Sequence, residues 1–331
     1  MQQPNKRVSV MQLKPLPKPS FDEFIQSCTP LLKIPELETQ MRERVRSIVK
    51  ELLDFKPNTD PAKNLKQFIQ KDENFLGVLL ALTNLSQEKF LRLLTAQRFA
   101  AKDFGPEWGA DRVYRKIKKD DQFAEKIARL FLEGRSSKLL AEQVADFYLD
   151  QLSLPANWSD VIRDENVVGN FVRKKLAGEY TDQKGEHIEK EIRHMLDGMQ
   201  AEYGITYAHG QVALVGKEID HAIPSLEDAY VMVMVSYMET TSSGQTKTAN
   251  EQQAMYQRIV GENIRHPRNK RVFVNVVDGA GWLARRSDLR KLLEGCDYCL
   301  NIKTIEQLKL IILRHVPDRF FKQPPSATAK G

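Results

Sequence analysis

The sequence predicts an α+β protein in two parts, an all-helical N-terminal domain followed by a mixed α/β domain with a central sheet. Three observations predict this fold class. From Phe21 to Leu154, apolar residues recur at spacings of three and four, the period of an amphipathic helix. After residue 160, strand-like apolar runs appear, and all six histidines lie there, between His187 and His315. A helix-like stretch separates two of these runs, which predicts a parallel crossover and a mixed sheet covered on both faces.

Composition and charge narrow the classes of protein that fit. The 331 residues are 41% hydrophobic, enough for two domains or for one large core with an appendage. The formal net charge is +6, which favours a polyanionic partner such as nucleic acid. The odd, sparse set Cys28, Cys296 and Cys299 argues against a disulfide framework. Cys296 and Cys299 form one CxxC without a second pair, so we expect two half-buried thiols there rather than a zinc site.

The ends of the chain and its hydropathy predict a cytoplasmic protein with no membrane contact. The N-terminal segment is polar and contains four prolines, and it lacks the apolar core of a signal peptide. No stretch reaches the roughly eighteen apolar residues of a membrane span. We therefore expect a flexible arm at residues 1–20 and a disordered tail at residues 319–331.

The helical domain is predicted for residues 21–157. Asp72 and Ser86 each precede a helix-like run as an N-cap residue, and Pro155 interrupts the pattern near the boundary. Five cations lie in the cluster Arg112–Lys119, a pattern typical of a solvated helix face or of a nucleic-acid contact. The helix-like runs are 21–34, 37–55, 62–70, 73–85, 86–104 and 123–134.

The elements of the second domain alternate between the two periods. Helices are predicted at 184–203, 247–264, 284–295 and 304–315. Strands are predicted at 205–208, 211–215, 217–223, 229–238, 271–277 and 297–302.

Acidic residues in three successive elements of this domain suggest metal-dependent hydrolysis. Asp220 lies in the middle of an apolar strand, where an unpaired carboxylate is costly to bury. Glu186 and Glu189 lie one turn apart on the preceding helix, and Glu251 begins the following one. Hydrolysis of a phosphodiester commonly uses a divalent metal held by carboxylates that converge on one sheet edge. The neighbouring His221 is expected to face the opposite side of the strand.

The order of helix, strands, helix and strand resembles the core of the PD-(D/E)XK nuclease superfamily, and in particular type II restriction endonucleases. The resemblance covers about residues 160–315. It implies a PD-(D/E)XK-type catalytic domain at residues 158–318, in which Asp220 matches the family's aspartate. Glu189 or Glu186 would match the glutamate of the preceding helix.

The sequence departs from the family pattern on the next strand. Where the (D/E)XK acid and lysine are expected, the chain has Met234 and Ser236. In an alternative alignment the acid has moved to the following helix. Ser236 then matches the serine of an S-x-K pattern, Glu251 is the moved acid, and Met238 stands at the lysine. In either alignment the lysine is missing from its usual place, and Lys247 or Lys217 could supply the amine.

Two further segments strengthen the resemblance. Residues 240–252 form a Ser/Thr/Gly-rich loop running into a helix, which could hold a phosphate or contact base edges. Residues 274–292 contain Asp-Gly-Ala-Gly-Trp after a buried strand, similar to a segment that follows the core in several restriction enzymes. Its glycines permit a tight turn, which is also the ordinary reading of such a sequence. The candidates for DNA contact in these segments are Gln245, Thr246, Arg285 and Arg286.

The resemblance implies a type II restriction endonuclease, a hydrolase that uses Mg²⁺ to cut a short specific site in double-stranded DNA. Asp220, Glu251 and Glu189 would be metal ligands, and Ser236 and Lys247 would complete the catalytic set. A homodimer would cut both strands, and a cognate DNA methyltransferase would belong to the same system. Two alternatives remain: a DNA-binding protein on a decayed nuclease fold, and a helical scaffold or interaction protein with a small α/β domain.

Overall fold

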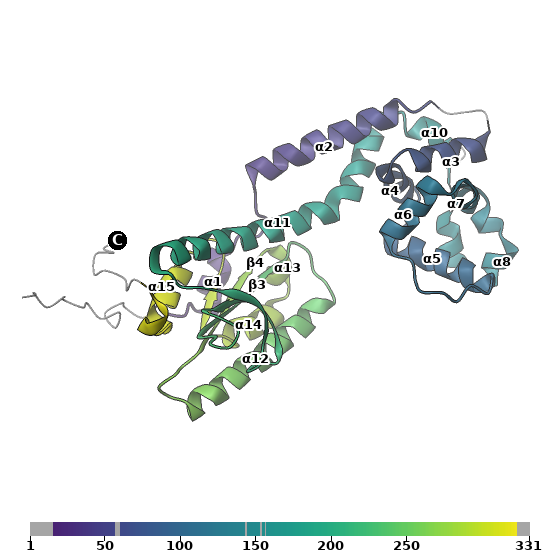
Figure 1. The fold of residues 1–331 in the computed structure, drawn as a ribbon. Helices are drawn as coiled ribbons and strands as arrows, with labels where there is room; N and C mark the ends of the chain where they lie inside the picture. Colours follow the sequence, from purple (N-terminus) through teal and green to yellow (C-terminus); the bar gives the residue numbers. More distant parts are fainter. Residues whose placement is uncertain (1–15, 57–59, 143, 153, 156, 323–331) are drawn as a thin grey trace, which may run out of the picture. The chain divides into compact units, whose positions relative to one another are not determined.

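The computed structural model describes residues 16–56, 60–142, 144–152, 154–155 and 157–322, and the chain divides into two compact units (Figure 1). The helical unit comprises residues 34–180. The sheet unit comprises residues 1–33 and 181–331. Most of the predicted N-terminal arm and most of the predicted tail, at 1–15 and 323–331, lie outside the described residues. Within the described residues, no helix is both long enough and apolar enough to cross a membrane.

The helical unit contains only helices among its described residues, as the apolar period predicts. The predicted N-caps are confirmed. Asp72 Oδ1 accepts a hydrogen bond from Asn74 N at 2.8 Å, and Ser86 Oγ accepts one from Lys89 N at 3.2 Å. The α-helices are α2 (Pro35–Leu53), α3 (Pro61–Lys71), α4 (Glu73–Leu82), α5 (Gln87–Ala100), α6 (Ala110–Lys119), α7 (Asp121–Glu133), α8 (Lys138–Ala141), α9 (Asp146–Leu149), α10 (Trp158–Val161) and the first part of α11 (Glu165–Tyr203), with 3₁₀ turns η2 (Gly134–Ser136) and η3 (Asp150–Leu152).

The core of the helical unit extends past the predicted boundary at residue 157. Trp158 is buried and packs edge-on against Phe68, with ring centroids 5.4 Å apart. Three apolar residues of α11, Val168, Val172 and Leu176, belong to the same core. The first half of α11 therefore completes the helical unit, and the division between the units falls at residue 180.

The sheet unit is built on a five-stranded mixed sheet in the order β1-β2-β3-β4-β5. The pairs β1–β2 and β2–β3 are antiparallel, whereas β3–β4 and β4–β5 are parallel, so the predicted crossover through a helix is confirmed. The elements are α1 (Phe21–Ser27), the second part of α11, β1 (Ala208–Val212), β2 (Lys217–Ile223), β3 (Val231–Tyr237), α12 (Gly244–Arg265), β4 (Val272–Asp278), α13 (Ala280–Ala284), α14 (Arg286–Glu294), β5 (Tyr298–Leu300), α15 (Gln307–His315) and the 3₁₀ turn η4 (Asp318–Phe320).

Several element boundaries differ from the predicted ones. One strand, β1, replaces the two predicted at 205–208 and 211–215, because the chain turns after Val212, whose carbonyl accepts from Val215 N and Gly216 N. The helix predicted at 284–295 is α14, and the short helix α13 before it was not predicted; Arg285, which has non-helical backbone angles, separates the two. The predicted tail also begins too early: Phe321 is buried, and Lys322 N donates to Tyr203 O at 2.9 Å.

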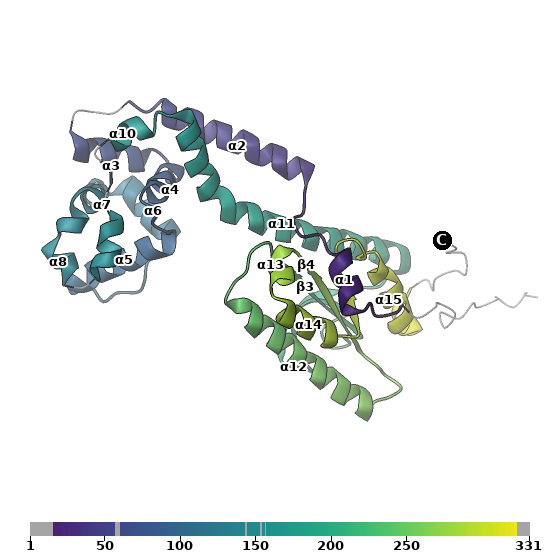
Figure 2. The ribbon, with the colours of Figure 1, turned by 180° about the vertical axis from the view of Figure 1, so that it is seen from behind.

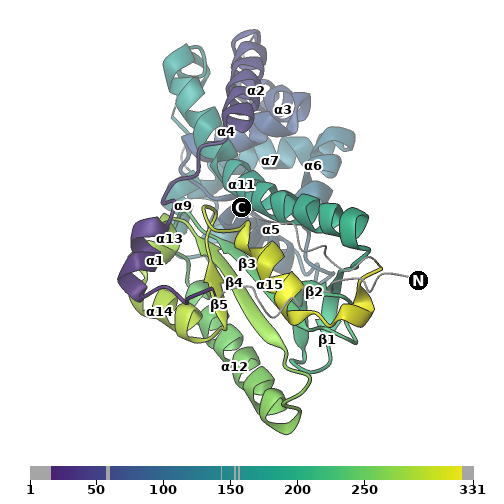
Figure 3. The same ribbon diagram turned by 90° about the vertical axis from the view of Figure 1, so that its left-hand side faces the viewer.

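Helices cover both faces of the sheet, as Figures 2 and 3 show. One face packs against α12, α14 and α1, with α13 beside them. The opposite face packs against α11 and α15. Strand β4, which lies between β3 and β5, is buried along its whole length, as expected for a parallel strand covered on both faces.

Helix α1 belongs to the sheet unit rather than to the predicted helical domain. Phe21 and Phe24 are buried in the core that α12 and α14 share. The chain after α1 is held at the carboxyl end of β4, where Asp278 Oδ1 accepts a hydrogen bond from Thr29 N at 2.6 Å. Sequence periodicity identifies such a helix but does not show which core it joins.

The Asp-Gly-Ala-Gly-Trp segment packs against the exit of β3. Gly281 N donates to Met238 O at 2.8 Å. A Cβ atom on Gly281 would lie 2.4 Å from Thr240 O, and one on Gly279, which has φ +105°, would lie 2.2 Å from Met238 O. Both glycines are therefore required because two backbone segments meet there.

Replacing Gly281 with alanine should destabilise the sheet unit by about 3 kcal/mol, because backbone would have to move to relieve the clash. The matched control is Gly198→Ala in α11, where a Cβ has no neighbour within 4 Å. Gly198→Ala should stabilise the sheet unit by up to about 1 kcal/mol, because alanine favours a helix more than glycine does. All three cysteines are buried in the sheet unit. Their labelling in increasing urea thus reports unfolding of this unit alone. Equal midpoints for the two variants would contradict the close-approach argument.

Candidate active site

The strand that carries Asp220 has an irregularity at that residue. In the register of β1 with β2, Ala208 is opposite Ala222 and Gly210 is opposite Ile219. One residue of β1, His209, therefore faces two residues of β2, Asp220 and His221. Such a bulge breaks the alternation of side chains and redirects them.

The bulge turns the Asp220 carboxylate toward the backbone of β3. Regular pairing of β2 with β3 ends at His221 and Val233. Beyond that pair, Asp220 Oδ2 accepts a hydrogen bond from Val235 N at 2.7 Å. The side chain thus takes an N–H that a strand carbonyl would otherwise accept. This contact fixes the carboxylate at the point where the two strands separate.

Burial raises the pKa of Asp220, and the Val235 N–H opposes that rise. The negative charge of Glu189 on α11 raises the pKa further, so these two predicted site residues lie close enough to repel each other. A cation between them would reverse the repulsion. Mg²⁺ often binds through one or two protein carboxylates and keeps several waters, so this pair of acids fits such an ion.

The third predicted metal ligand has a different partner. Glu251 Oε1 of α12 lies 3.2 Å from Lys217 Nζ at the start of β2. Among the described residues, no group of three or more His, Cys, Asp or Glu side chains is placed to hold a metal ion. The structure therefore places the charge of Glu189 where it acts on Asp220, with Arg193 3.9 Å from Glu189 Oε2, and pairs Glu251 with Lys217. Glu186, the alternative to Glu189, is 3.7 Å from Lys190 on the exposed side of α11.

The two β3 residues at the signature positions have structural contacts. Met234 is partly buried and packs against the core under α12. Ser236 Oγ accepts a hydrogen bond from the buried Trp282 Nε1 at 3.1 Å. Ser236 thereby attaches β3 to the Asp-Gly-Ala-Gly-Trp segment. Lys247, on the first turn of α12, is exposed, so its amine is available to a ligand.

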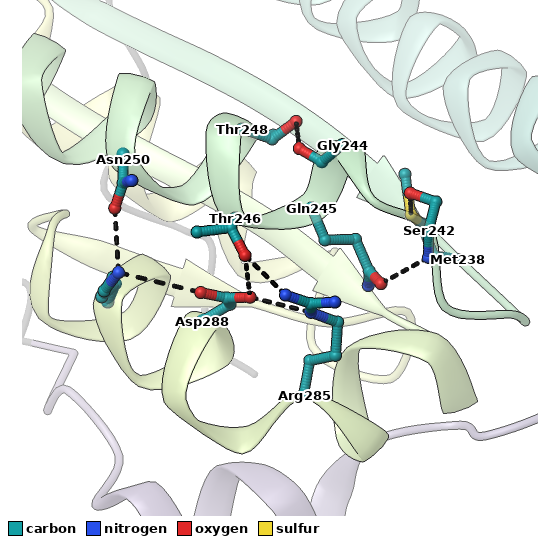
Figure 4. Close-up of polar contacts among 10 residues, drawn as sticks. Met238, Ser242, Gly244, Gln245, Thr246, Thr248, Asn250, Arg285 and Asp288 are labelled. Atoms are coloured by element: carbon teal, nitrogen blue, oxygen red, sulfur yellow. Dashed lines mark hydrogen bonds and ion pairs between the residues drawn. The ribbon is translucent and has the colours of Figure 1, made fainter.

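The residues predicted to contact DNA are largely occupied within the protein, as Figure 4 shows. Thr246 Oγ1 lies 2.9 Å from Asp288 Oδ2, and Arg285 donates both to the same carboxylate oxygen and to Thr246 Oγ1. Asp288 is buried, and its pKa is lowered by Arg285, Thr246 and Lys291 against the effect of burial. This network attaches the start of α12 to α14.

The other two candidates differ in exposure. Gln245 is fully buried; its Oε1 accepts from Ser242 N at 2.9 Å, and its Nε2 has no hydrogen-bond partner among the described residues. Arg286 has a side chain that is 66% exposed, with Asp22 at 3.6 Å. Of the four, Arg286 thus has the side chain most exposed to a nucleic acid.

A buried charged cluster at the carboxyl end of β3 was not identified from the sequence. Lys184 Nζ of α11 lies 2.7 Å from Glu239 Oε1, and the Tyr237 hydroxyl donates to the same oxygen at 2.6 Å. The side chains of Lys184 and Glu239 are 4% and 11% exposed. The signal in the sequence was Glu239, an acid shortly after the strand β3. Its partner Lys184 lies 55 residues earlier in the chain, so the sequence did not indicate the pair.

The raised pKa of Asp220 gives a stability prediction with a definite sign. A carboxyl whose pKa is higher in the folded state holds its proton more tightly there. Unfolding free energy therefore falls as pH rises from about 4 through the folded pKa, by about 1.4 kcal/mol per unit of pKa rise. Asp220→Asn removes this loss, and its amide oxygen can still accept from Val235 N.

Calorimetry of the sheet unit should therefore show Asp220→Asn gaining stability over the wild type as pH rises from about 4 to about 7. Glu186→Gln, at an exposed position on α11, should show no such trend. A constant difference between Asp220→Asn and the wild type across this range would show that Asp220 has an ordinary pKa.

Comparison with known proteins agrees with the resemblance seen in the sequence. Residues 163–310 match the family model of the DpnII restriction endonuclease, a segment that includes all five strands and Asp220. No curated protein and no solved structure matches the chain. The family match supports a restriction endonuclease, with the sheet unit carrying the matched strands.

Proposed function

We propose that this protein is a type II restriction endonuclease that hydrolyses phosphodiester bonds at a short specific site in double-stranded DNA, with Mg²⁺ as cofactor. The observation that carries the proposal is the family match over residues 163–310, which includes the partly buried Asp220, a carboxylate of raised pKa that accepts from Val235 N. A buried carboxylate in a sheet, repelled by a second one, is typical of a site that a divalent cation completes. The PD-(D/E)XK core remains the proposed form of this fold.

In this proposal Asp220 and Glu189 hold the metal ion. When bound, Mg²⁺ would lower the pKa of a water molecule and stabilise the charge that develops on the phosphate. Asp220 is preorganised for this role because Val235 N fixes its carboxylate. Glu251 is the proposed third ligand, and its ion pair with Lys217 balances its charge before DNA arrives.

The remaining roles follow from exposure. Lys247 is the proposed source of the amine that the family has on β3, because its ammonium group is exposed at the start of α12. Ser236 is proposed to position the site through Trp282 rather than to react. Arg286 is the proposed DNA contact, with Gln245, Thr246 and Arg285 holding the loop and helix that present it.

Cutting both strands of a symmetric site is most simply achieved by a homodimer with a two-fold axis. We also propose that a cognate DNA methyltransferase protects the host site and that the enzyme acts in the cytoplasm. These partners are consequences of the restriction–modification role.

One observation favours a second candidate, a DNA-binding protein whose nuclease site has decayed. Met234 lies one residue beyond the His221–Val233 pair, on the part of β3 facing Asp220, where the family pattern expects an acid. A methionine there cannot bind Mg²⁺, since hard cations require oxygen ligands. Metal-dependent cutting separates the two candidates.

The decisive test is incubation of purified protein with unmethylated phage DNA, in Mg²⁺ and in EDTA. We expect discrete fragments that require Mg²⁺. Asp220→Ala should slow cutting at least about a hundredfold, because several kcal/mol of charge stabilisation are lost. Glu189→Gln should also reduce cutting strongly.

Glu186→Gln is the matched control, since it removes an equivalent charge from the same helix and should cut normally. Intact DNA despite tight binding would replace the proposal with the decayed nuclease. If the protein neither binds nor cuts DNA, the remaining candidate is a helical scaffold or interaction protein. Unchanged cutting by Asp220→Ala would show that another residue holds the metal.

A further inference from the structure

The exposed face of α6 in the helical unit is strongly basic. Arg112, Arg115, Lys118 and Lys119 are all exposed. Arg112, Arg115 and Lys119 have the spacing of one helix face, three and four residues apart. Among the described residues, none of these four cations has an acidic partner within ion-pair distance. The buried face of the same helix, Val113 and Ile117, is used in the core.

Three acids near this face pair with cations outside the set of four, although Arg112 also adds to the positive charge around Asp103. Asp103 pairs with Arg98 at 2.7 Å, and Asp120 lies 3.3 Å from Lys116. Glu107 pairs with Arg92. The only acid on α6 itself is Asp111, at its first turn. The local charge at the exposed face is consequently positive and unpaired, which suits a polyanion.

An exposed aromatic pair adjoins the basic face. Phe99 at the end of α5 and Phe104 in the following loop are 50% and 68% exposed, and their rings meet edge-on at 5.0 Å. Two large apolar side chains held together at the surface are costly in water unless a partner covers them. Phe104 belongs to the segment between the end of α5 at Ala100 and the start of α6 at Ala110, and Figure 1 shows this α5–α6 loop leading into α6.

This loop is held in a defined shape. The Arg98 guanidinium, 8% exposed as a residue, binds both oxygens of Asp103 and the carbonyl of Pro106. Its carbon lies 4.3 Å from the centre of the Trp108 ring, and that of Arg112 lies 5.5 Å from the same ring. The loop that presents Phe104 is thereby attached to the first turn of the basic helix.

From these contacts we infer that α6 and the α5–α6 loop form a second DNA-binding surface, in which the four cations bind phosphates and Phe104 contacts the bases as an apolar wedge. The inference rests on the proposed function, which supplies duplex DNA as the ligand. Cationic side chains give sequence-independent affinity through counterion release, and inserted apolar side chains are a known means of gripping a groove.

Duplex DNA fits this surface better than a membrane does. Binding in a bilayer interface requires an amphipathic helix to bury a continuous apolar face. The apolar face of α6 already packs inside the helical unit, which leaves two phenylalanines to insert. Phosphates spaced along a duplex, in contrast, match a helix face with cations at successive turns.

The test measures binding of the full chain to a short fluorescent DNA duplex by anisotropy, in EDTA so that no cutting occurs, across roughly 50 to 200 mM salt. The triple variant Arg112→Gln, Arg115→Gln and Lys119→Gln should weaken binding at least tenfold at the lower salt. It should also reduce the slope of log K against log salt by about 1 to 3, since each phosphate contact contributes about 0.9.

The matched control is Arg42→Gln, Arg46→Gln and Lys50→Gln on α2, which removes the same charge from the same unit. That helix carries exposed acids among its cations, including Glu36, Glu43 and Glu51, so little change is expected. Phe104→Ala should weaken binding severalfold and leave the salt slope unchanged.

Equal effects of the two triple variants would overturn the inference, because bulk charge alone would then explain binding. Binding of wild-type protein to anionic vesicles with no affinity for DNA would replace it with a membrane surface. Failure of the proposed function looks different: the wild type would not cut DNA in Mg²⁺. If the wild type cuts and binds DNA, and the α6 triple variant binds DNA equally well, this inference is wrong while the proposed function stands.

Discussion

The hydrogen bond from Val235 N to Asp220 is the contact on which the arrangement of the site depends. The bond lies beside the irregularity at which His209 of β1 faces Asp220 and His221 of β2, and beyond the last β2–β3 pair, His221 with Val233. The cost of the bulge is visible next to it. Both ring nitrogens of His221 are buried without hydrogen-bond partners among the described residues, and burial lowers the pKa of that imidazole to about 4. Burial beside this irregularity thus lowers the pKa of His221 and raises that of Asp220.

A second constraint holds the other side of β3. The turn at Gly279 and Gly281 approaches the backbone after the strand so closely that no side chain fits, and Trp282 then donates to Ser236. These contacts fix β3 between β2 and the turn. They also explain why Ser236 and Trp282 stabilise the fold and do not face a ligand. Their polar groups bond to each other inside the protein, so few are left to bind a ligand.

Much of the fold could be predicted from the sequence, since its helices and strands are set by local periodicity. The caps at Asp72 and Ser86 and the fully buried β4 follow from residue type and spacing alone. What could not be predicted depends on contacts between distant residues. The bulge at Asp220 is decided by pairing with β1, and the partner of Glu239 lies on α11. For the same reason the sequence indicated three acids but not which two would meet.

The distribution of charge suggests how binding and chemistry are divided between the two units. In the sheet unit, Lys217 and Lys184 are each paired with an acid, and Arg285 is held by Asp288, so a phosphate arriving there would compete with existing ion pairs. Exchange of one ion pair for another contributes little net free energy. The unpaired cations of α6 face no such competition and release only counterions on binding. The helical unit would therefore add affinity for DNA to that supplied by the exposed Lys247 and Arg286 of the sheet unit. In the proposed function, a bound cation would relieve the repulsion between Asp220 and Glu189 in the sheet unit, so chemistry there and the extra affinity of α6 would be separate contributions.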